Sequence, residues 1–212
     1  MGLLIDLHVH TRPLSVCSHI DPGTLVRQAV KMQLDGLVIT EHQYQWPECD
    51  LRALLEASGE PNFLLLAGFE YMSTQGDILV YGMSAEQAAA FPPGLTPAEA
   101  VERAHESGAV CIAAHPTRAG MEFDECILTL PFDAIEIQSS NLRDHEHRLA
   151  ARLAQNTGLR PVATSDAHQL KNVGCYATEF DDPIQSMPDL LKSLRCGRFR
   201  PVGCAAVGTP EE

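Results

Sequence analysis

Short apolar runs alternate along the chain with longer segments of helical pattern. The apolar runs show no strict alternation of apolar and polar positions, which is typical of strands buried on both faces of a parallel sheet. The pattern predicts seven strands, at Leu3–His8, Gly36–Thr40, Phe63–Phe69, Ile78–Tyr81, Ala109–Ala114, Phe132–Gln138 and Pro161–Thr164.

Several helices are expected to begin at a polar capping residue followed by proline, which has no amide hydrogen to leave unpaired in the first turn. The predicted helices run from Asp21-Pro22 to about Leu34, from Asp50, from Thr96-Pro97 to Gly108, from about Leu142 to Asn156, and from Asp182-Pro183 toward Arg195.

This order of elements predicts a single α/β domain. About seven βα units in a chain of 212 residues favour a distorted (β/α)7 TIM-like barrel. A doubly wound open sheet is the alternative, but neither a G-x-G-x-x-G sequence nor a Walker loop follows the first strand. We expect the barrel to occupy residues 1–203 and a C-terminal tail to occupy residues 204–212.

Composition narrows the classes of partner. Hydrophobic residues make up 45% of the chain, and 28 acidic against 15 basic residues give a net charge of −13, which disfavours duplex nucleic acid. No apolar run approaches the ~20 residues that span a membrane, and the N-terminus lacks a signal peptide, so we expect a cytoplasmic protein without membrane partners. Seven cysteines without a C-x-x-C pair predict neither a disulfide framework nor a Cys-rich zinc site. The oligomeric state stays open.

Nine histidines are many for an acidic chain, and their positions are informative. His8 and His10 stand two apart at the end of the first strand, where both side chains point to the same side. The other candidate ligands that follow predicted strands are His42, Glu70, His115, Asp166 and His168. In a barrel of parallel strands these ends converge on the face that carries active sites.

The candidate set contains five imidazoles and two carboxylates, which suits Mn, Zn or Fe better than Ca or Mg alone. It is too large for one ion, so we expect two or three divalent metal ions. A carboxylate such as Glu70 can bridge two ions, and such a pair lowers the pKa of a shared water. Hydrolysis is the chemistry that this set favours.

Five motifs occur in a fixed order: Asp6-Leu-His-Val-His-Thr, Ile39-Thr-Glu-His, Gly68-Phe-Glu, Ala114-His-Pro and Thr164-Ser-Asp-Ala-His. In this order they resemble the polymerase and histidinol phosphatase (PHP) family over nearly the whole chain. The resemblance implies a distorted barrel with a two- or three-metal site that usually hydrolyses phosphate esters. Carried over, it implies His8, His10, Glu70 and Asp166 as ligands of a first ion, Glu70 and His115 of a second, and His42 with His168 of a third.

Two departures from the family pattern concern the metal ligands. Many relatives carry a histidine where this chain has Asp77, in Gly76-Asp-Ile-Leu. We expect Asp77 to replace that imidazole at the second ion and to tilt preference toward Mn or Fe; the alternative is that it merely starts a strand. Glu41 stands where relatives commonly have Asp, and it could orient His42 rather than bind metal.

The loop after His10 lacks the Asp or His that often completes the third ion's shell in relatives. Its polar residues Ser15, Cys17 and Ser18 are poor substitutes, although His19 could fold back. The third site is therefore the least secure part of the hypothesis.

Substrate contacts are expected from arginine, whose planar fork suits two phosphate oxygens. Arg118, three residues after His115, is the best placed and Arg12 is second. A solvated loop arginine is the alternative for each. Asn141 and Arg143 could also reach the mouth of the site, and Asn141 could instead cap a helix.

The hypothesis is a metal-dependent phosphoesterase that acts on a small phosphomonoester or nucleotide. Asp166 and His168 would help manage the proton of the leaving group. Two alternatives stay open: a metal-dependent C–N or C–O bond hydrolase on the same fold, and a non-catalytic, metal-stabilised module.

Overall fold

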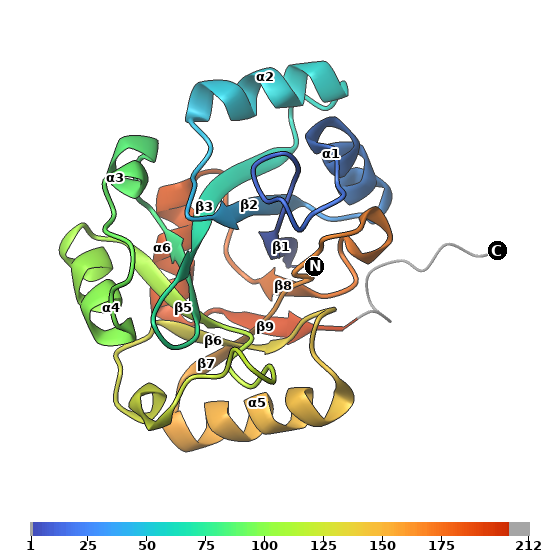
Figure 1. The fold of residues 1–212 in the computed structure, drawn as a ribbon. Coiled ribbons are helices and arrows are strands. Elements are labelled where there is room, and N and C mark those ends of the chain that lie inside the picture. The colour runs from blue at the N-terminus through green and yellow to red at the C-terminus, as the bar shows by residue number, and fades with distance from the viewer. Residues whose placement is uncertain (1, 204–212) are drawn as a thin grey trace.

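A computed structural model describes residues 2–203 of the chain. Nine strands form one sheet in the order β7-β6-β5-β4-β3-β2-β1-β8-β9, which curls into a barrel (Figure 1). The strands are β1 (Leu3–Val9), β2 (Gly36–His42), β3 (Leu64–Met72), β4 (Asp77–Tyr81), β5 (Val110–Ala114), β6 (Ala134–Gln138), β7 (Arg160–Ala163), β8 (Ala177–Phe180) and β9 (Phe199–Val202).

Helices lie around the sheet (Figure 1). They are α1 (Pro22–Lys31), α2 (Glu48–Ser58), α3 (Ala85–Ala89), α4 (Pro97–Glu106), α5 (Asp144–Thr157) and α6 (Met187–Cys196), with short 3-10 turns at Glu125–Leu128 and Leu170–Asn172. Asp21 and Thr96 cap α1 and α4 through their side chains, as the cap-proline pattern predicts. No helix within the described residues is long and apolar enough to cross a membrane.

The sheet is mixed, which corrects the expectation of parallel strands throughout. Strands β1, β2 and β3 pair in parallel, as do β5, β6 and β7, but β4 runs antiparallel to both β3 and β5. Strand β8 is antiparallel to β1, and β9 is antiparallel to β8. Because β4 is reversed, its first residue lies at the end of the barrel where its neighbours finish.

The strand order ends at β7 and β9, so the opening of the barrel lies between these two strands. Beside it, Thr178 of β8 accepts a hydrogen bond from the Ala163 amide (3.2 Å) and donates one to the Ala163 carbonyl (2.9 Å). This contact ties β7 to the β8-β9 pair next to the opening. The barrel is therefore nearly closed, as the βα pattern predicts.

Five elements differ clearly from the sequence prediction. Strands β8 and β9 and the short helix α3 were not predicted, because each is too short or too polar to give a clear pattern. Helix α6 begins at Met187 after the cap Ser186, and not at Asp182-Pro183, because Ser186 accepts a hydrogen bond from the Asp189 amide. Helix α2 begins at Glu48, two residues before Asp50. The predicted tail, residues 204–212, lies outside the described residues.

Candidate metal centre

All eight proposed ligands meet at one end of the barrel. Seven of them lie in the last residues of β1, β2 and β3 or in the segments that follow β1, β5 and β7. Asp77 reaches the same place from the start of the reversed strand β4, where it pairs with Met72 of β3 and Ala114 of β5. Gly76 turns the chain into β4 with φ of 79°, and a Cβ there would lie 2.5 Å from the Phe123 ring.

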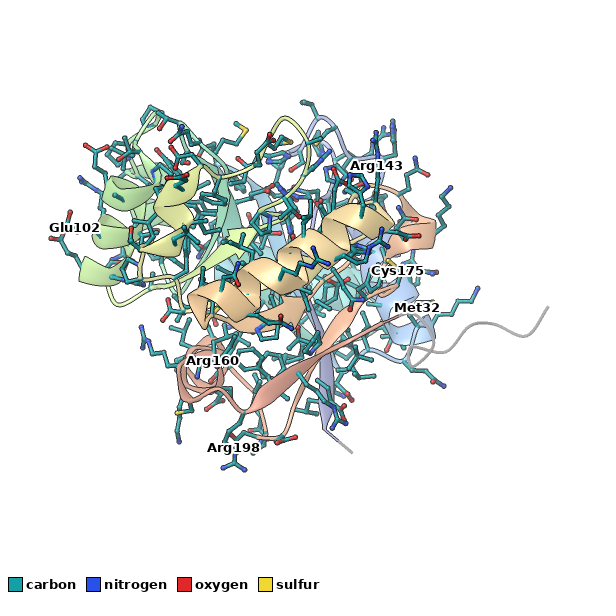
Figure 2. All side chains as sticks on the ribbon, turned by 90° about the horizontal axis from the view of Figure 1, so that it is seen from below. Met32, Glu102, Arg143, Arg160, Cys175 and Arg198 are labelled. Carbon is teal, nitrogen blue, oxygen red and sulfur yellow. The ribbon has the colours of Figure 1, made fainter. Side chains whose placement is uncertain are left out.

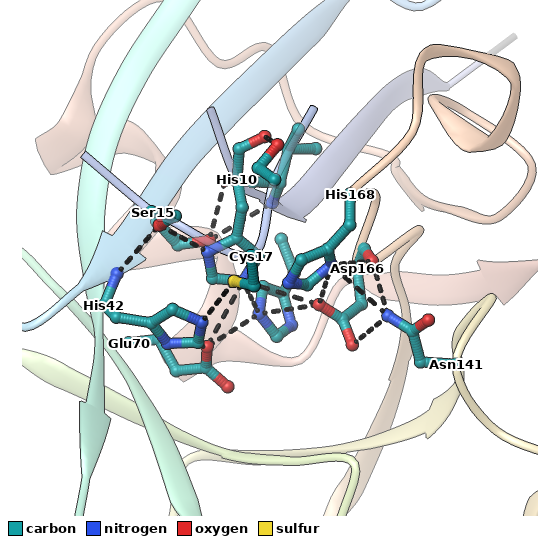
Figure 3. Close-up of polar contacts among 12 residues, drawn as sticks. His10, Ser15, Cys17, His42, Glu70, Asn141, Asp166 and His168 are labelled. Carbon is teal, nitrogen blue, oxygen red and sulfur yellow. Dashed lines mark hydrogen bonds and ion pairs between the residues drawn. The ribbon is translucent and has the colours of Figure 1, made fainter. Parts of the chain in front are cut away.

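Glu70 is the centre of the cluster. Its Oε1 lies 2.9 Å from His115 Nε2, and its Oε2 lies 2.9 Å from His42 Nδ1 and 3.2 Å from His10 Nε2. His8 Nε2 is 3.5 Å from the same Oε2 and 3.0 Å from His10 Nε2 (Figure 3). One carboxylate thus faces four imidazoles, which is the arrangement expected of a bridging ligand.

Three groups within this cluster have ligand atoms that lie within 4.8 Å of one another: His8, His10 and Asp166; Glu70, Asp77 and His115; His10, His42 and His168. They overlap with the three sets that the family resemblance implies, but the first lacks Glu70, the second adds Asp77 and the third adds His10. Asp77 falls among the possible ligands, although the sequence left open whether it merely starts a strand.

The chemistry of the donors fits divalent ions. Asp77 is only 5% exposed, and its Oδ2 is buried without a hydrogen-bond partner, 3.8 Å from His115 Nε2. Nδ1 of His115 is also buried without a partner. An unpaired buried carboxylate oxygen is costly, and a cation between Asp77, Glu70 and His115 would remove that cost.

Glu136 of β6 holds two of the proposed ligands, His8 and His115, by hydrogen bonds, and it was not among the predicted site residues. Its Oε1 lies 3.1 Å from His8 Nδ1, and its Oε2 accepts a hydrogen bond from the His115 amide (2.6 Å). Thr164 also donates to this carboxylate. A carboxylate on one ring nitrogen orients the other nitrogen toward a metal. The signal available in the sequence was an acidic residue inside the apolar run Ala134-Ile-Glu-Ile.

Asp6 has a similar supporting role at the start of the first motif. Its fully buried carboxylate accepts hydrogen bonds from the amides of Ser165 (2.9 Å) and Gly174 (3.2 Å). It therefore ties β1 to the segment that carries Asp166. Burial raises the pKa of Asp6 to about 6 despite these hydrogen bonds.

Glu41 anchors the loop after β1, which corrects the idea that it orients the His42 ring. Its carboxylate accepts hydrogen bonds from the Thr11 amide (3.0 Å), the Ser15 hydroxyl and the Trp46 indole (3.0 Å). The same Ser15 oxygen lies 3.2 Å from His10 Nδ1. Glu41 thus acts on His10 through Ser15. Its contact with the Trp46 indole also ties the segment between β2 and α2 to this carboxylate.

Charge in the cluster is balanced between imidazoles and carboxylates. Burial alone would raise the pKa of Glu70, but His8, His10 and His115 hold it well below its usual range. Burial disfavours charge on His115, yet its hydrogen bond to Glu70 raises the pKa of His115 to about 9. Asp77 differs, because burial and the nearby Glu70 charge raise its pKa to about 6. The buried carboxylates thus raise the pKa values of His8, His10 and His115 against the effect of burial.

Two ligands occupy left-handed backbone conformations that residues with side chains rarely adopt. His115 has φ of 25° and Asp166 has φ of 46°. His115 follows directly on β5, and Asp166 lies three residues after the end of β7. The chain turns at His115, where the Arg118 amide donates to the His115 carbonyl at 2.9 Å. These turns bring both side chains into the cluster.

The candidate substrate-binding residues differ in how close they lie to the metal-ligand cluster. Nη1 of Arg118 lies 3.9 Å from Asp166 Oδ2, and its side chain is 34% exposed, so it is beside the cluster and open to solvent. Asn141 does not cap a helix; its amide donates to both the carbonyl and Oδ2 of Asp166, each at 2.7 Å. Arg12 is exposed on the loop after His10.

Two further candidate residues, Arg143 and His19, do not take the positions that the sequence analysis suggested. Arg143 is at the N-terminal end of α5 (Figure 2), where its amide donates to Glu146 at 2.7 Å. His19 is exposed and does not fold back; only its amide contacts the site region, donating to the His168 carbonyl at 2.9 Å.

A family model described as PHP-associated matches residues 144–199, which carry α5, the segment with Asp166 and His168, and α6. Together with the ordered motifs and their convergence at one end of the barrel, this match supports the predicted resemblance to the PHP family.

One curated relative and several solved structures are similar to this chain at low sequence identity. The uncharacterised protein MJ1587 of Methanocaldococcus jannaschii is 26% identical over 149 residues, which cover 66% of this chain and 83% of that protein. The crystal structure of PsfC from Pseudomonas syringae has a TM-score of 0.72 at 21% identity and covers 98% of this chain and 94% of its own.

Two further crystal structures concern proteins with assigned activities. One, from Bifidobacterium adolescentis and provisionally assigned as a metal-dependent phosphoesterase, has a TM-score of 0.63 at 16% identity and covers 91% of this chain and 95% of its own. The lesion-specific endonuclease EndoQ of Pyrococcus furiosus has a TM-score of 0.69 at 16% identity and covers 95% of this chain but 58% of its own. At this identity the likeness concerns the barrel fold.

Proposed function

We propose that this protein is a metal-dependent phosphoesterase that removes phosphate from a small phosphomonoester or nucleotide. The observation that carries the proposal is the set of three neighbouring ligand groups, which Glu70 contacts through four imidazoles, with the Arg118 guanidinium beside them. Bound divalent ions would supply an activated water and would neutralise charge on the phosphoryl oxygens.

The ligand residues divide by burial in a way that suits this role. His8, His10, His115, Glu70, Asp77 and Asp166 are all buried, whereas the side chains of His42 and His168 are 24% and 22% exposed. A substrate phosphate would therefore enter from the side of His42 and His168. The buried members would hold their geometry while it does so.

Arg118 would bind the phosphoryl group. Its guanidinium is partly exposed and only 3.9 Å from Asp166 Oδ2, so it can turn its remaining donors toward a substrate without leaving the cluster. Asn141 donates to the same Asp166 carboxylate at 2.7 Å and keeps it in place. A carboxylate held in this way can stay fixed when Arg118 turns to a phosphate.

The leaving group would receive its proton from the side of His168. Nδ1 of His168 lies 3.0 Å from the Asp166 carbonyl, and the ring is partly exposed. Burial lowers the pKa of His168, which disfavours a protonated ring, so a solvent water on this exposed side would deliver the proton to the leaving group. Asp166 would orient the ring.

The test combines metal analysis with a substrate panel. Protein reconstituted with Mn, Zn or Fe should release phosphate from small phosphomonoesters, and a metal chelator should abolish that release. The same panel should contain amides and carboxylic esters, which a C–N or C–O hydrolase would cleave. Less than one bound ion per chain, with no phosphate release after metal addition, would overturn the proposal.

The non-catalytic alternative is addressed by His8→Ala with His10→Ala. A catalytic centre requires that this double variant lose phosphate release altogether. If thermal stability fell while turnover of every substrate stayed unchanged, the metal cluster would be structural and the phosphoesterase proposal would be wrong.

A further inference from the structure

Cys17 lies beside the most exposed of the three ligand groups. Its Sγ is 3.3 Å from His42 Nε2, and His42 belongs to the group with His10 and His168 (Figure 3). The sequence analysis treated this cysteine as a poor substitute for the Asp or His of relatives. The structure instead brings it to the edge of a cluster of three imidazoles.

The loop that carries Cys17 is held on both sides by the metal-site segments. The Arg12 amide donates to the Ile20 carbonyl at 2.9 Å, which closes the base of the loop. The Ser18 hydroxyl donates to the His10 carbonyl at 2.8 Å, and the His19 amide donates to the His168 carbonyl at 2.9 Å. Cys17 therefore keeps a fixed position relative to two of the three imidazoles.

We propose that Cys17 is the fourth ligand of the ion held by His10, His42 and His168. The inference rests on the proposed metal-dependent function and specifies one of its sites. On binding, the thiol would release its proton to solvent as the metal–sulfur bond forms. Three imidazoles and one thiolate are a soft set that favours Zn, Fe or Co over Mn and Mg.

The distance agrees with this role. Zn–S and Zn–N bonds of ordinary length place the sulfur and nitrogen ligands of one tetrahedral ion about 3.5 Å apart. The observed separation of 3.3 Å between Cys17 Sγ and His42 Nε2 requires little movement. The competing explanation is a hydrogen bond from the thiol to His42 with no role in metal binding.

Cobalt reconstitution separates these explanations. Co(II) coordinated by a thiolate shows a charge-transfer absorption in the near ultraviolet, which imidazole and carboxylate ligands do not give. The protein loaded with Co(II) should show this absorption, and Cys17→Ser should abolish it. Cys49→Ser is the matched control, because Cys49 is also exposed but lies on α2, and it should leave the absorption unchanged.

Metal content gives a second readout. Cys17→Ser should lose up to one zinc per chain during dialysis against a weak chelator, whereas Cys17→Asp should retain the ion and shift preference toward Mn. No thiolate absorption in the cobalt-loaded protein, or an absorption that persists in Cys17→Ser, would overturn the proposal.

These readouts need no substrate, so they are independent of the phosphoesterase test. A Cys17-dependent absorption in a protein that cleaves no phosphate ester would support the ligand and contradict the proposed function. Phosphate release without the absorption would support the function and contradict the ligand.

Discussion

The two ends of the metal centre differ in how they are built. The inner group, Glu70, Asp77 and His115, has side chains that are at most 7% exposed, and its support comes from Glu136 on a neighbouring strand. The outer group, His10, His42 and His168, has two rings that are more than a fifth exposed, and a loop surrounds it. We therefore expect the inner group to bind its ion tightly and the outer group to exchange its ion readily.

The largest effect is expected where the two groups meet. Glu70 contacts ligands of both, so Glu70→Gln should remove charge from both groups at once and disturb more than one ion. Metal ions contribute several kcal/mol to such reactions, so phosphate release should fall about 10³-fold. Metal analysis should show fewer ions per chain. A variant that kept full metal content and full activity would show that Glu70 does not bridge.

A smaller and more selective effect is expected from Glu136→Gln. Glu136 accepts hydrogen bonds from the His8 ring and from the His115 amide. Gln would place an NH2 group, which cannot accept, at one of these two positions, so one of the two hydrogen bonds would be lost. Loss of such supporting carboxylates typically lowers metal affinity about 10- to 100-fold. Competition with a chelator should show weaker binding at the groups that contain His8 and His115, and unchanged binding through His42 and His168. Glu99→Gln, which preserves the capping pattern of α4, is the control.

Arg118→Ala tests whether the partly exposed Arg118 binds the substrate phosphate. Removal of a charged donor to phosphate costs about 1.5 kcal/mol or more, so KM for a phosphomonoester should rise roughly tenfold. Metal content should not change. Arg118→Lys should recover part of the loss, and Arg12→Ala should have a weaker effect because Arg12 is exposed on its loop. Equal damage to the cleavage of an uncharged ester would contradict a phosphate-binding role.

The smallest effect is expected at Glu146, whose side chain holds the segment next to Arg118 by hydrogen bonds. Glu146 of α5 accepts hydrogen bonds from the amides of Arg143 and Ala119, which lower its pKa. Its ionised form stabilises the fold above the pKa of an unfolded-chain glutamate, about 4.3, and that stabilisation is lost as pH falls through the lower folded-state pKa. Thermal unfolding should therefore show that Glu146→Gln lowers Tm at pH 7 and has less effect near pH 3. A difference in Tm that stayed constant with pH would contradict this.

The fold was predictable wherever apolar runs were long enough to show a pattern. Strands β1 to β7 and the capped helices α1 and α4 follow the sequence closely. The direction of β4 was not predictable, because a five-residue apolar strand has the same composition in either direction. That direction decides the position of Asp77, so the sequence could name the residue but not place it.

The convergence of the candidate ligands was predictable because strand ends in a barrel meet at one face, whatever the details of the loops. The supporting residues were not. Glu136 stands in a strand interior, and its role depends on the pairing of β5 with β6, which no local pattern records. Cys17 depends on the path of a loop whose hydrogen bonds join it to His10 and His168. Such contacts between distant segments are beyond sequence periodicity.

The left-handed turns at His115 and Asp166 have a consequence for how the site could be transplanted. Each such conformation costs about 1–3 kcal/mol, and the surrounding barrel sustains that cost before any ion arrives. The backbone is thus preorganised, and ion exchange can proceed by movement of side chains alone. The same ligands grafted onto a relaxed barrel would have to bend its backbone during binding. They would hold their ions more weakly, even with every donor atom present.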